Sequence, residues 1–417
     1  MSDADRHSPP WITATAFSGA TASRIAAQEV SAAIRTHCPL RPDALFLFAS
    51  FHHRAAFASV VEIVRAQLHP EHVLGCVVES VIEGGNQHER LAGLSALALH
   101  APQVRITPWW LDVEDGPPQV WEMQSLRNRL ALDELHRGAI AVADPYSMHS
   151  NAALEALDRA APPSGANIIG GIASGASFPG LNVMIVDHHL TSAGMVGLSF
   201  GGPIVIDSML SQGCRAVGKT FLVTKSQHNT LLELSGVSAI AAAQQAAVTL
   251  GGDTAKLLAQ GLLVGILANE HAPSAHGRFE RDQFLAREIL TVDPARGSIT
   301  TQAHIAVGRT VRFLLRDGIT VRDDLAMQLD RELLREGAEC ALLFTCIGRE
   351  HAAADEAETD AATIVRRLSP PAKGLFLPKP LPLSGFRAAG EFGRVATRSY
   401  QHGQTAALAL FRRTASA

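Results

Sequence analysis

Alternating apolar and polar positions divide most of the chain into short buried strands and amphipathic helices. Runs of about six apolar residues are typical of buried strands, and apolar residues three and four positions apart are typical of helices packed on a sheet. One order of elements occurs three times: a strand, a helix, a second strand containing a glycine, a Gly-rich loop and a closing strand. The first strands are expected at residues 44–49, 139–143 and 341–346, and the closing strands at 94–99, 195–200 and 406–411.

The repeated order predicts an α/β fold with mixed β-sheets and helices packed outside them. We expect repeated β-α-β-β units in layers of the α-β-β-α type, because one unit cannot cover both faces of its own sheet. The loop between the last two strands of each copy is too short for a helix, so those strands should pair antiparallel. Each second strand carries an apolar pair before a glycine, at Gly75, Gly170 and Gly385. General alternation of strands and helices remains the alternative to a true repeat.

The segment between the second and third copies has a different pattern. Strands are expected around the polar loop at 211–215, and the sequence at 227–229 favours a hairpin turn. Further elements are expected along this segment: helices at 238–250, 254–258 and 323–336, and a buried strand at 262–267. We place a boundary at the end of the hairpin. The predicted parts are a flexible tail at 1–12, a first domain at 13–235 and a second domain at 236–417.

The composition is that of a globular protein, with 47% hydrophobic and 18% charged residues. A net charge of −4 without runs of like charge argues against a nucleic-acid partner and against an anionic membrane surface, since both require clustered Lys and Arg. The polar N-terminus lacks the order of a signal peptide, and no apolar stretch approaches the roughly 20 residues that span a bilayer. We therefore expect a cytoplasmic protein.

The residues that usually mark metal and catalytic sites do not form known patterns in this chain. The five cysteines are scattered without a C-x-x-C pair, which argues against a disulfide framework or a structural zinc site. Adjacent histidines such as His52 and His53 would point to opposite faces of a strand. The fingerprints of P-loops, nucleophile elbows, zinc proteases and dinucleotide sites are missing from the sequence. We predict no metal, no cofactor and no catalytic residue.

The best-marked polar loop, at 211–215, joins two predicted strands. Arg215 could bind a carboxylate through two parallel hydrogen bonds, and Gln212 offers one donor and one acceptor. These groups suit an amino acid or a small carboxylate. A surface turn with a solvated arginine is the alternative.

Two further loops follow strands of the third copy. Cys346 and Arg349 lie where a strand ends near a glycine, a position at which α/β folds often bind ligands. Glu391 and His402 lie on neighbouring strands and could hydrogen-bond each other or a ligand. A buried cysteine and a structural turn with a paired glutamate are the alternatives.

Five motifs then occur in one order along the chain. They are Ser211-Gln212-Gly213-Cys214-Arg215 with Gly218, Arg316-Asp317, Cys346 with Gly348 and Arg349, Gly390-Glu391, and His402-Gly403 followed by Thr405-Ala406. In this order they resemble the FIST family, from about Thr13 to Phe411. The family's Gly-Glu-Ile-Gly-Pro appears here as Gly-Glu-Phe-Gly-Arg, and the first copy carries Val77, Val78 and Ser80 where the family commonly has small residues.

The resemblance implies a two-module sensor of signal transduction that binds a small ligand such as an amino acid. It also implies that no catalytic activity is to be expected. The ligand-binding residues carried over by the motifs are Gln212, Arg215, Cys346, Arg349, Glu391 and His402. Two alternatives stay open. One is an interaction adaptor that works through a signalling protein partner, and the other is a cysteine-dependent hydrolase that uses Cys346 with His402.

Overall fold

The computed structural model describes residues 10–248, 261–270, 283–349, 358–369 and 380–414. Two compact units are present, and each is described by itself. Unit 1 comprises residues 1–210, 328–350 and 356–417, and unit 2 comprises residues 211–327 and 351–355. Most of the predicted tail at 1–12 and the predicted helix at 254–258 lie outside the described residues. Within those residues, no helix combines the length and the apolar character needed to cross a membrane.

The described part of unit 1 contains three six-stranded sheets, which confirms the predicted α/β class with mixed sheets. The first sheet has the order β1 (Ile12–Ser18), β6 (Leu94–His100), β2 (Ala44–Ser50), β3 (His72–Val78), β10 (Met184–Val186) and β11 (His189–Thr191). The second has the order β24 (Arg398–His402), β23 (Glu391–Val395), β9 (Ile168–Ile172), β8 (His136–Ala143), β12 (Met195–Gly201) and β7 (Arg105–Leu111). The third has the order β13 (Ile204–Ser211), β25 (Ala406–Arg413), β21 (Cys340–Cys346), β22 (Leu383–Ala388), β4 (Val81–Glu83) and β5 (Asn86–His88).

The three sheets share one arrangement of strands. Each has a central parallel pair, formed by β2 with β3, β8 with β9, and β21 with β22. An antiparallel closing strand flanks the first strand of each pair, and a hairpin flanks the second. Every hairpin comes from another copy: β4–β5 joins the third sheet, β10–β11 the first and β23–β24 the second.

This arrangement corrects the pairing expected from the sequence. The last two strands of each predicted unit do not pair with each other, because the closing strand pairs with the first strand instead. The Gly-rich loop between them forms a hairpin that completes a different sheet. Each unit is therefore longer than the predicted β-α-β-β order.

The glycine shared by the three second strands is required by a close approach of two backbones. A Cβ added at Gly170 would lie 1.9 Å from the carbonyl oxygen of Ala141, and one at Gly385 would lie 1.9 Å from that of Leu343. The same Cβ at Gly75 would lie 2.3 Å from the oxygen of the residue that it faces on β2. Any side chain at these positions would push the parallel pair apart.

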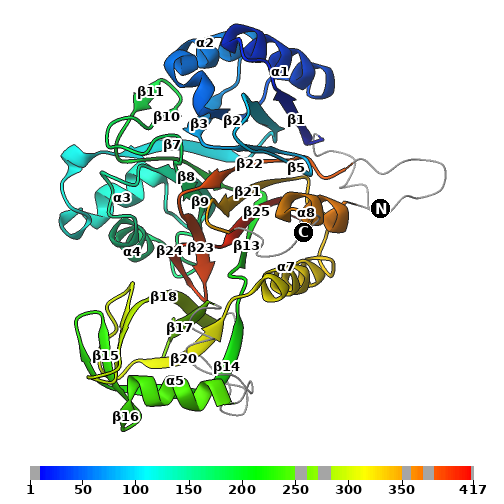
Figure 1. The fold of residues 1–417 in the computed structure, drawn as a ribbon. Helices are drawn as coiled ribbons and strands as arrows, with labels where there is room; N and C mark the ends of the chain where they lie inside the picture. Colours follow the sequence, from blue (N-terminus) through cyan, green and yellow to red (C-terminus); the bar gives the residue numbers. More distant parts are fainter. Residues whose placement is uncertain (1–9, 249–260, 271–282, 350–357, 370–379, 415–417) are drawn as a thin grey trace. The chain divides into compact units, whose positions relative to one another are not determined.

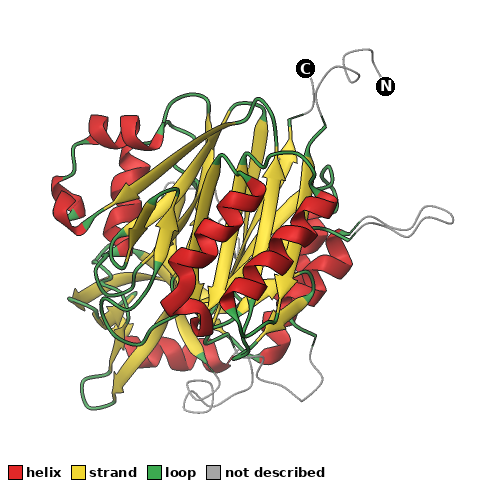
Figure 2. Ribbon diagram, turned by 90° about the horizontal axis from the view of Figure 1, so that it is seen from above, coloured by secondary structure: helices red, strands yellow, loops and turns green. Residues whose placement is uncertain are grey.

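Alternation along the strands separates an inner core from a core beneath helices. Phe46 and Phe48 on β2 face the inner core, whereas Leu45 and Leu47 on the same strand face α1 and α2. The helices are α1 (Ser23–His37), the short η2 (Phe51–Ala56) and α2 (Phe57–Leu68) on the first sheet, and α3 (Met123–Leu130) and α4 (Ser150–Ala160) on the second. Figure 1 shows α1 and α2 side by side over β1, β2 and β3, and Figure 2 shows helices outside the strands.

Three phenylalanines, one from each copy, meet in the inner core. The ring centroids of Phe46 and Phe200 are 6.4 Å apart, those of Phe46 and Phe411 are 6.1 Å apart, and those of Phe200 and Phe411 are 5.6 Å apart. These rings belong to β2, β12 and β25, so the three sheets share one apolar interior.

The carboxyl ends of the three parallel pairs meet at one end of unit 1. The hydroxyl of Ser174 accepts from the amide of Glu79 at 3.0 Å and donates to the carbonyl of Arg387 at 2.5 Å. The amide of Ala389 donates to the carbonyl of Ile172 at 3.0 Å. These bonds connect the carboxyl ends of β9 and β22 and the residues that directly follow β3, β9 and β22. The ends of strands from all three sheets are therefore neighbours.

Unit 2 is built on a sheet that closes on itself. Its order is β14 (Arg215–Gln227), β20 (Thr310–Leu315), β17 (Leu262–Leu267), β18 (Phe284–Asp293), β19 (Ser298–Thr301), β15 (Thr230–Leu234) and β16 (Val237–Ser238), and β14 also pairs with β15. Helix α5 (Ala239–Val248) packs its alanines on Val217, Phe221 and Phe313. The strand expected at 262–267 and the hairpin turn expected at 227–229 are confirmed. The predicted boundary at 235 falls inside this unit and stays a prediction.

Candidate functional site

The first strand of each copy, β2, β8 or β21, ends at an equivalent position, and the three positions carry different polar residues. The glycines of the second strands lie opposite Leu47, Ala141 and Leu343 in the parallel registers. Three residues further along the first strands come Ser50, Asp144 and Cys346. These positions lie at the carboxyl ends of the parallel strands, where α/β proteins usually bind ligands.

In the first copy the polar groups of the strand end bind one another. The hydroxyl of Ser50 accepts from the amide of Gly93 at 3.0 Å. His53, three residues after Ser50, is buried, and its Nδ1 lies 2.9 Å from the hydroxyl of Ser23.

The second copy has a comparable set of local bonds. Asp144 Oδ2 accepts from the amide and the hydroxyl of Ser147, at 2.9 and 2.6 Å. Asp144 Oδ1 accepts from the side-chain amide of Asn182 at 2.8 Å. Ser50 and Asp144 are thus bound within the protein, while His53 Nε2 and Asn182 Oδ1 have no hydrogen-bond partner among the described residues.

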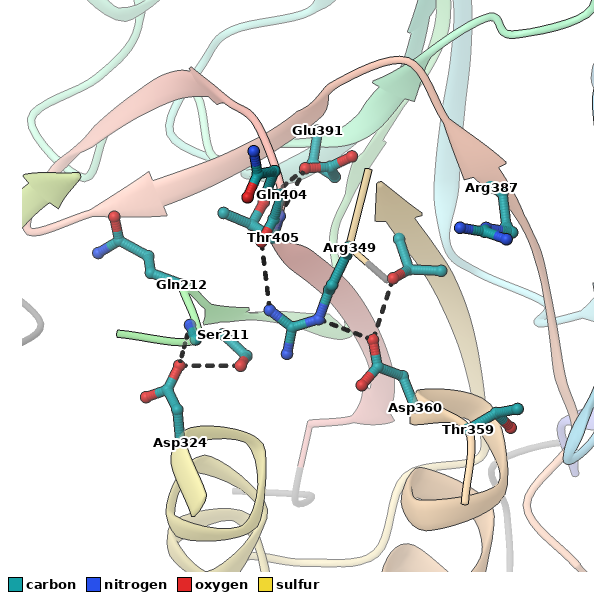
Figure 3. Close-up of polar contacts among 12 residues, drawn as sticks. Ser211, Gln212, Asp324, Arg349, Thr359, Asp360, Arg387, Glu391, Gln404 and Thr405 are labelled. Carbon is teal, nitrogen blue, oxygen red and sulfur yellow. Dashed lines mark hydrogen bonds and ion pairs between the residues drawn. The ribbon is translucent and has the colours of Figure 1, made fainter. Parts of the chain in front are cut away.

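The third copy places a carboxyl group inside the strand end. Glu391 begins β23, opposite His402 on β24, and its side chain is fully buried. Its Oε2 accepts from the hydroxyl of Thr405 at 2.6 Å and from the Thr405 amide at 3.2 Å (Figure 3). Its Oε1 has no hydrogen-bond partner of normal geometry among the described residues. One oxygen of a buried carboxyl group is thus left unsatisfied, which is unusual for a native structure.

Burial controls the ionisation of Glu391. It raises the pKa of this carboxyl group to about 8, although the hydrogen bonds from Thr405, the charge of Arg349 and the nearby thiol of Cys346 all lower it. The side chain is therefore mostly an uncharged acid at neutral pH. An uncharged acid can donate a hydrogen bond as well as accept one.

Cys346 ends β21 beside Glu391 and is 6% exposed. Burial, and then the negative charge of Glu391, raise the pKa of this thiol to about 11. A catalytic cysteine needs a lowered pKa, because the thiolate is the nucleophile. The direction of the shift does not favour a cysteine-dependent hydrolase.

Arg349 forms a buried ion pair with Asp360. Its Nε lies 2.8 Å from Asp360 Oδ2, and the two side chains are 1% and 3% exposed. The same carboxylate oxygen accepts from the hydroxyl of Thr345 at 3.0 Å, and Arg349 Nη1 donates to the carbonyl of Gln404 at 3.4 Å (Figure 3). Thr359 caps α8 (Asp360–Leu368) at its amino end, where a negative charge is stabilised. Arg349 thus already has a carboxylate partner within the protein.

His402 completes this group of residues. Its Nε2 lies 3.1 Å from the carbonyl oxygen of Gly393. Because residues opposite each other in an antiparallel pair share a face, its side chain lies on the same face of the sheet as that of Glu391. The structure therefore brings together Cys346, Arg349, Glu391 and His402, and we call these four residues with Asp360 and Thr405 the third-copy cluster.

The two remaining predicted residues, Gln212 and Arg215, belong to unit 2. The side-chain Nε2 of Gln212 donates to the backbone carbonyl of Phe284 at 2.7 Å, and its side-chain Oε1 accepts from the backbone amide of Ala286 at 2.9 Å. The side chain thus takes the place of a strand partner for β18. Both ends of the amide are bound within the protein, which disfavours the predicted contact of Gln212 with a ligand.

The rest of this loop is also held by the protein. Asp324 on α7 (Gly318–Glu332) accepts from the hydroxyl of Ser211 at 2.8 Å and from the amide of Gly213 at 2.6 Å (Figure 3). The side chain of Arg215 is 45% exposed, with its Nη2 3.9 Å from Asp317. Of the two predicted residues in unit 2, only Arg215 presents its polar group to solvent.

Sequence reasoning missed Asp360 and the role of Thr405. The signal for Asp360 was present, since Thr359 followed by an acidic residue is typical of a helix start. The bonds from Thr405 to Glu391 depend on how β23 and β25 are folded, and no local pattern predicts them. Among the described residues, no three His, Cys, Asp or Glu side chains are arranged to hold a metal ion.

Comparisons with known proteins agree over most of the chain. Residues 43–237 match the FIST N domain, and residues 239–394 match the FIST C domain. An uncharacterized protein of Mycobacterium tuberculosis is 30% identical over 386 residues, which cover 89% of this chain and 91% of the relative. An uncharacterized protein of Mycobacterium bovis is 30% identical over 373 residues, which cover 89% of this chain and 90% of the relative.

One solved structure also resembles the chain. The crystal structure of a cyanuric acid hydrolase from A. caulinodans has a TM-score of 0.29 and 14% sequence identity, and the match covers 65% of this chain and 83% of that chain. A TM-score this low carries no argument about the present protein.

Proposed function

Since this chain belongs to the FIST family, whose domains are sensory domains of signal transduction, we propose that it is a sensor for a small polar ligand. The ligand is an amino acid or a similar small carboxylate, and it binds at the third-copy cluster.

The observation that carries this proposal is the unsatisfied oxygen of Glu391. A buried polar atom without a partner costs about 1–3 kcal/mol of stability. Ser50 and Asp144, at the first and second strand ends, are bound by short internal bonds, although the neighbouring His53 Nε2 and Asn182 Oδ1 also lack a partner among the described residues. In the third copy this cost falls on an oxygen of a carboxyl group. A ligand that supplies the missing hydrogen bond would recover it, and the position at the carboxyl ends of parallel strands supports such a role.

The exposed backbone beside the cluster supports access for a small molecule. Ile347 and Gly348 directly follow Cys346 and are exposed, as is Gly403 in the loop after β24. A Cβ added at Gly348 would lie 3.8 Å from Cys346 Sγ and 3.5 Å from Gln404, so both loops lie over the thiol. These loops are the proposed entry side.

Thermal-shift measurements with the twenty amino acids and small carboxylates test the proposal. A ligand present at 100 times its dissociation constant should stabilise the protein by about 2.7 kcal/mol. Thr405→Val and Cys346→Ala should weaken binding about tenfold, which is about 1.4 kcal/mol. Ser50→Ala, the equivalent change in the first copy, is the matched control and should leave the affinity unchanged. A response to none of these compounds, or equal effects in the three variants, contradicts the proposal.

A second candidate function is that of an adaptor for a protein partner. Large apolar side chains are exposed just after all three first strands: Phe51 at 45%, Tyr146 at 43% and Ile347 at 37%. Exposed apolar groups at one end of a domain are common in contact surfaces. If a partner protein is captured equally well with and without ligand, and Phe51→Ser and Tyr146→Ser abolish capture, the adaptor function is favoured over the sensor.

A further inference from the structure

We infer that the ligand offers a hydrogen-bond acceptor, a carbonyl or carboxylate oxygen, to Glu391 held as an uncharged acid. The inference rests on the proposed sensory function and specifies how the ligand is recognised. An amine that would pair with an ionised Glu391 is the competing possibility.

The assignment of donors around Glu391 supports an acceptor on the ligand. Both hydrogen bonds from Thr405 end on Oε2, so that oxygen is the acceptor of the carboxyl group. The acidic proton then belongs on Oε1, which has no hydrogen-bond partner of normal geometry. The neighbouring thiol of Cys346 is protonated too, since its pKa is raised, and it interacts with the carboxyl group of Glu391. The proton on Oε1 then matches a lone pair of a ligand oxygen.

Burial, and not the groups that face it, favours the uncharged form of Glu391. The thiol of Cys346 on β21, the guanidinium of Arg349 and the hydroxyl and amide of Thr405 next to β25 all lower its pKa. His402 on β24 lies opposite Glu391 in the strand register. β9 pairs with the start of β23 through glycines and brings no titratable group opposite Glu391. The charge of Arg349 is balanced by Asp360 at 2.8 Å. Complete burial therefore decides the outcome and keeps the pKa of Glu391 near 8.

The inference fixes the direction of the pH dependence of binding. With a pKa of about 8, the uncharged fraction of Glu391 falls from about nine tenths at pH 7 to about one tenth at pH 9. Binding of an acceptor should therefore weaken about tenfold between these pH values. Binding of an amine should strengthen by a similar factor, because it requires the ionised form.

Propionate and ethylamine are suitable probes because neither titrates between pH 7 and 9. Their dissociation constants are measured by thermal shift at pH 7, 8 and 9, with sodium chloride at equal ionic strength as the reference. Glu391→Gln is the decisive variant, since its amide keeps an acceptor for Thr405 and a permanent donor on the other side. Asp158→Asn is the matched control. Asp158 is a half-buried acid of unit 1 whose pKa is raised by burial.

The expected result is binding of propionate that weakens about tenfold from pH 7 to pH 9 in wild type and in Asp158→Asn. In Glu391→Gln, propionate should bind about as well as to wild type at pH 7 and show no such loss at pH 9. Binding of ethylamine that strengthens with pH and is abolished in Glu391→Gln overturns the inference but leaves the sensory function standing. The same holds if amino acids bind and propionate does not. If no amino acid and neither probe binds, the proposed function fails and the inference fails with it.

Discussion

At the first and third strand ends of unit 1, different side chains bind an equivalent backbone amide. The amides of Ser50 and Cys346 donate to the carbonyls of Gly93 and Thr405, which shows that the two ends are equivalent. The amide of Gly93 is bound by the hydroxyl of Ser50 at 3.0 Å, whereas the amide of Thr405 is bound by the carboxyl group of a different strand.

This difference separates a structural strand end from one suited to a ligand. A serine hydroxyl satisfies the amide with one small, uncharged group from the same strand end. A buried glutamate satisfies the same amide but leaves its second oxygen without a partner, at a cost in stability. A buried group that is only half satisfied requires an explanation, and a bound ligand is one such explanation.

The largest expected effect is the loss of the buried ion pair that borders the third strand end. Arg349→Ala leaves Asp360 buried and unpaired, so the free energy of unfolding should fall by about 3–5 kcal/mol. Denaturant unfolding measures this change. Arg366→Ala, which removes an exposed ion pair with Glu358 near the same helix, should cost less than about 1 kcal/mol. Equal costs in the two variants would contradict the role given to burial.

The second prediction concerns stability against pH. The pKa of Glu391 is raised from 4.5 to about 8, so between these values the folded protein holds a proton that the unfolded chain has released. Its contribution is therefore fully present below pH 4.5 and is lost as the pH rises to 8, by up to about 4 kcal/mol. Relative to Glu391→Gln, wild type should lose stability over this window. A difference between the two proteins that is constant with pH would show that Glu391 is already ionised.

The smallest effect is expected at the first strand end. Ser50→Ala leaves the buried amide of Gly93 without its acceptor and removes the contact of the hydroxyl with His52 Nδ1 at 3.3 Å, which should cost about 1–2 kcal/mol at pH 8. Ser177→Ala, at an exposed position, serves as the control and should change stability by less than about 0.5 kcal/mol. A cost at Ser50 as large as that of Arg349→Ala would remove the distinction between the two strand ends.

The sequence predicts the elements of unit 1 better than their partners. The strands at 44–49 and 341–346 and the glycines opposite them follow from apolar runs, which are local signals. The hairpin β4–β5 does not follow from such local signals, because its strands have three residues each and β4 pairs with β22, about 300 positions away. Such pairing is decided by the fold as a whole and not by local propensity.

For the candidate site residues, too, the sequence predicts positions better than partners. Cys346, Arg349, Glu391 and His402 come together as their positions at strand ends suggested. Gln212 has the chemistry of a ligand-binding residue, but its amide replaces a strand partner of β18. The sequence gives the donors and acceptors of a side chain, and only the fold decides whether the protein itself has already used them.

The most direct test of this account compares two equivalent amide protons. In a TROSY spectrum of the isotope-labelled protein, the amide signals of Thr405 and Gly93 report on the third and first strand ends. Titration with the amino acid or carboxylate that gives the largest thermal shift should move the Thr405 signal and leave the Gly93 signal in place. An unmoved Thr405 signal, or equal shifts of both signals, would contradict the claim that the third strand end is the ligand site.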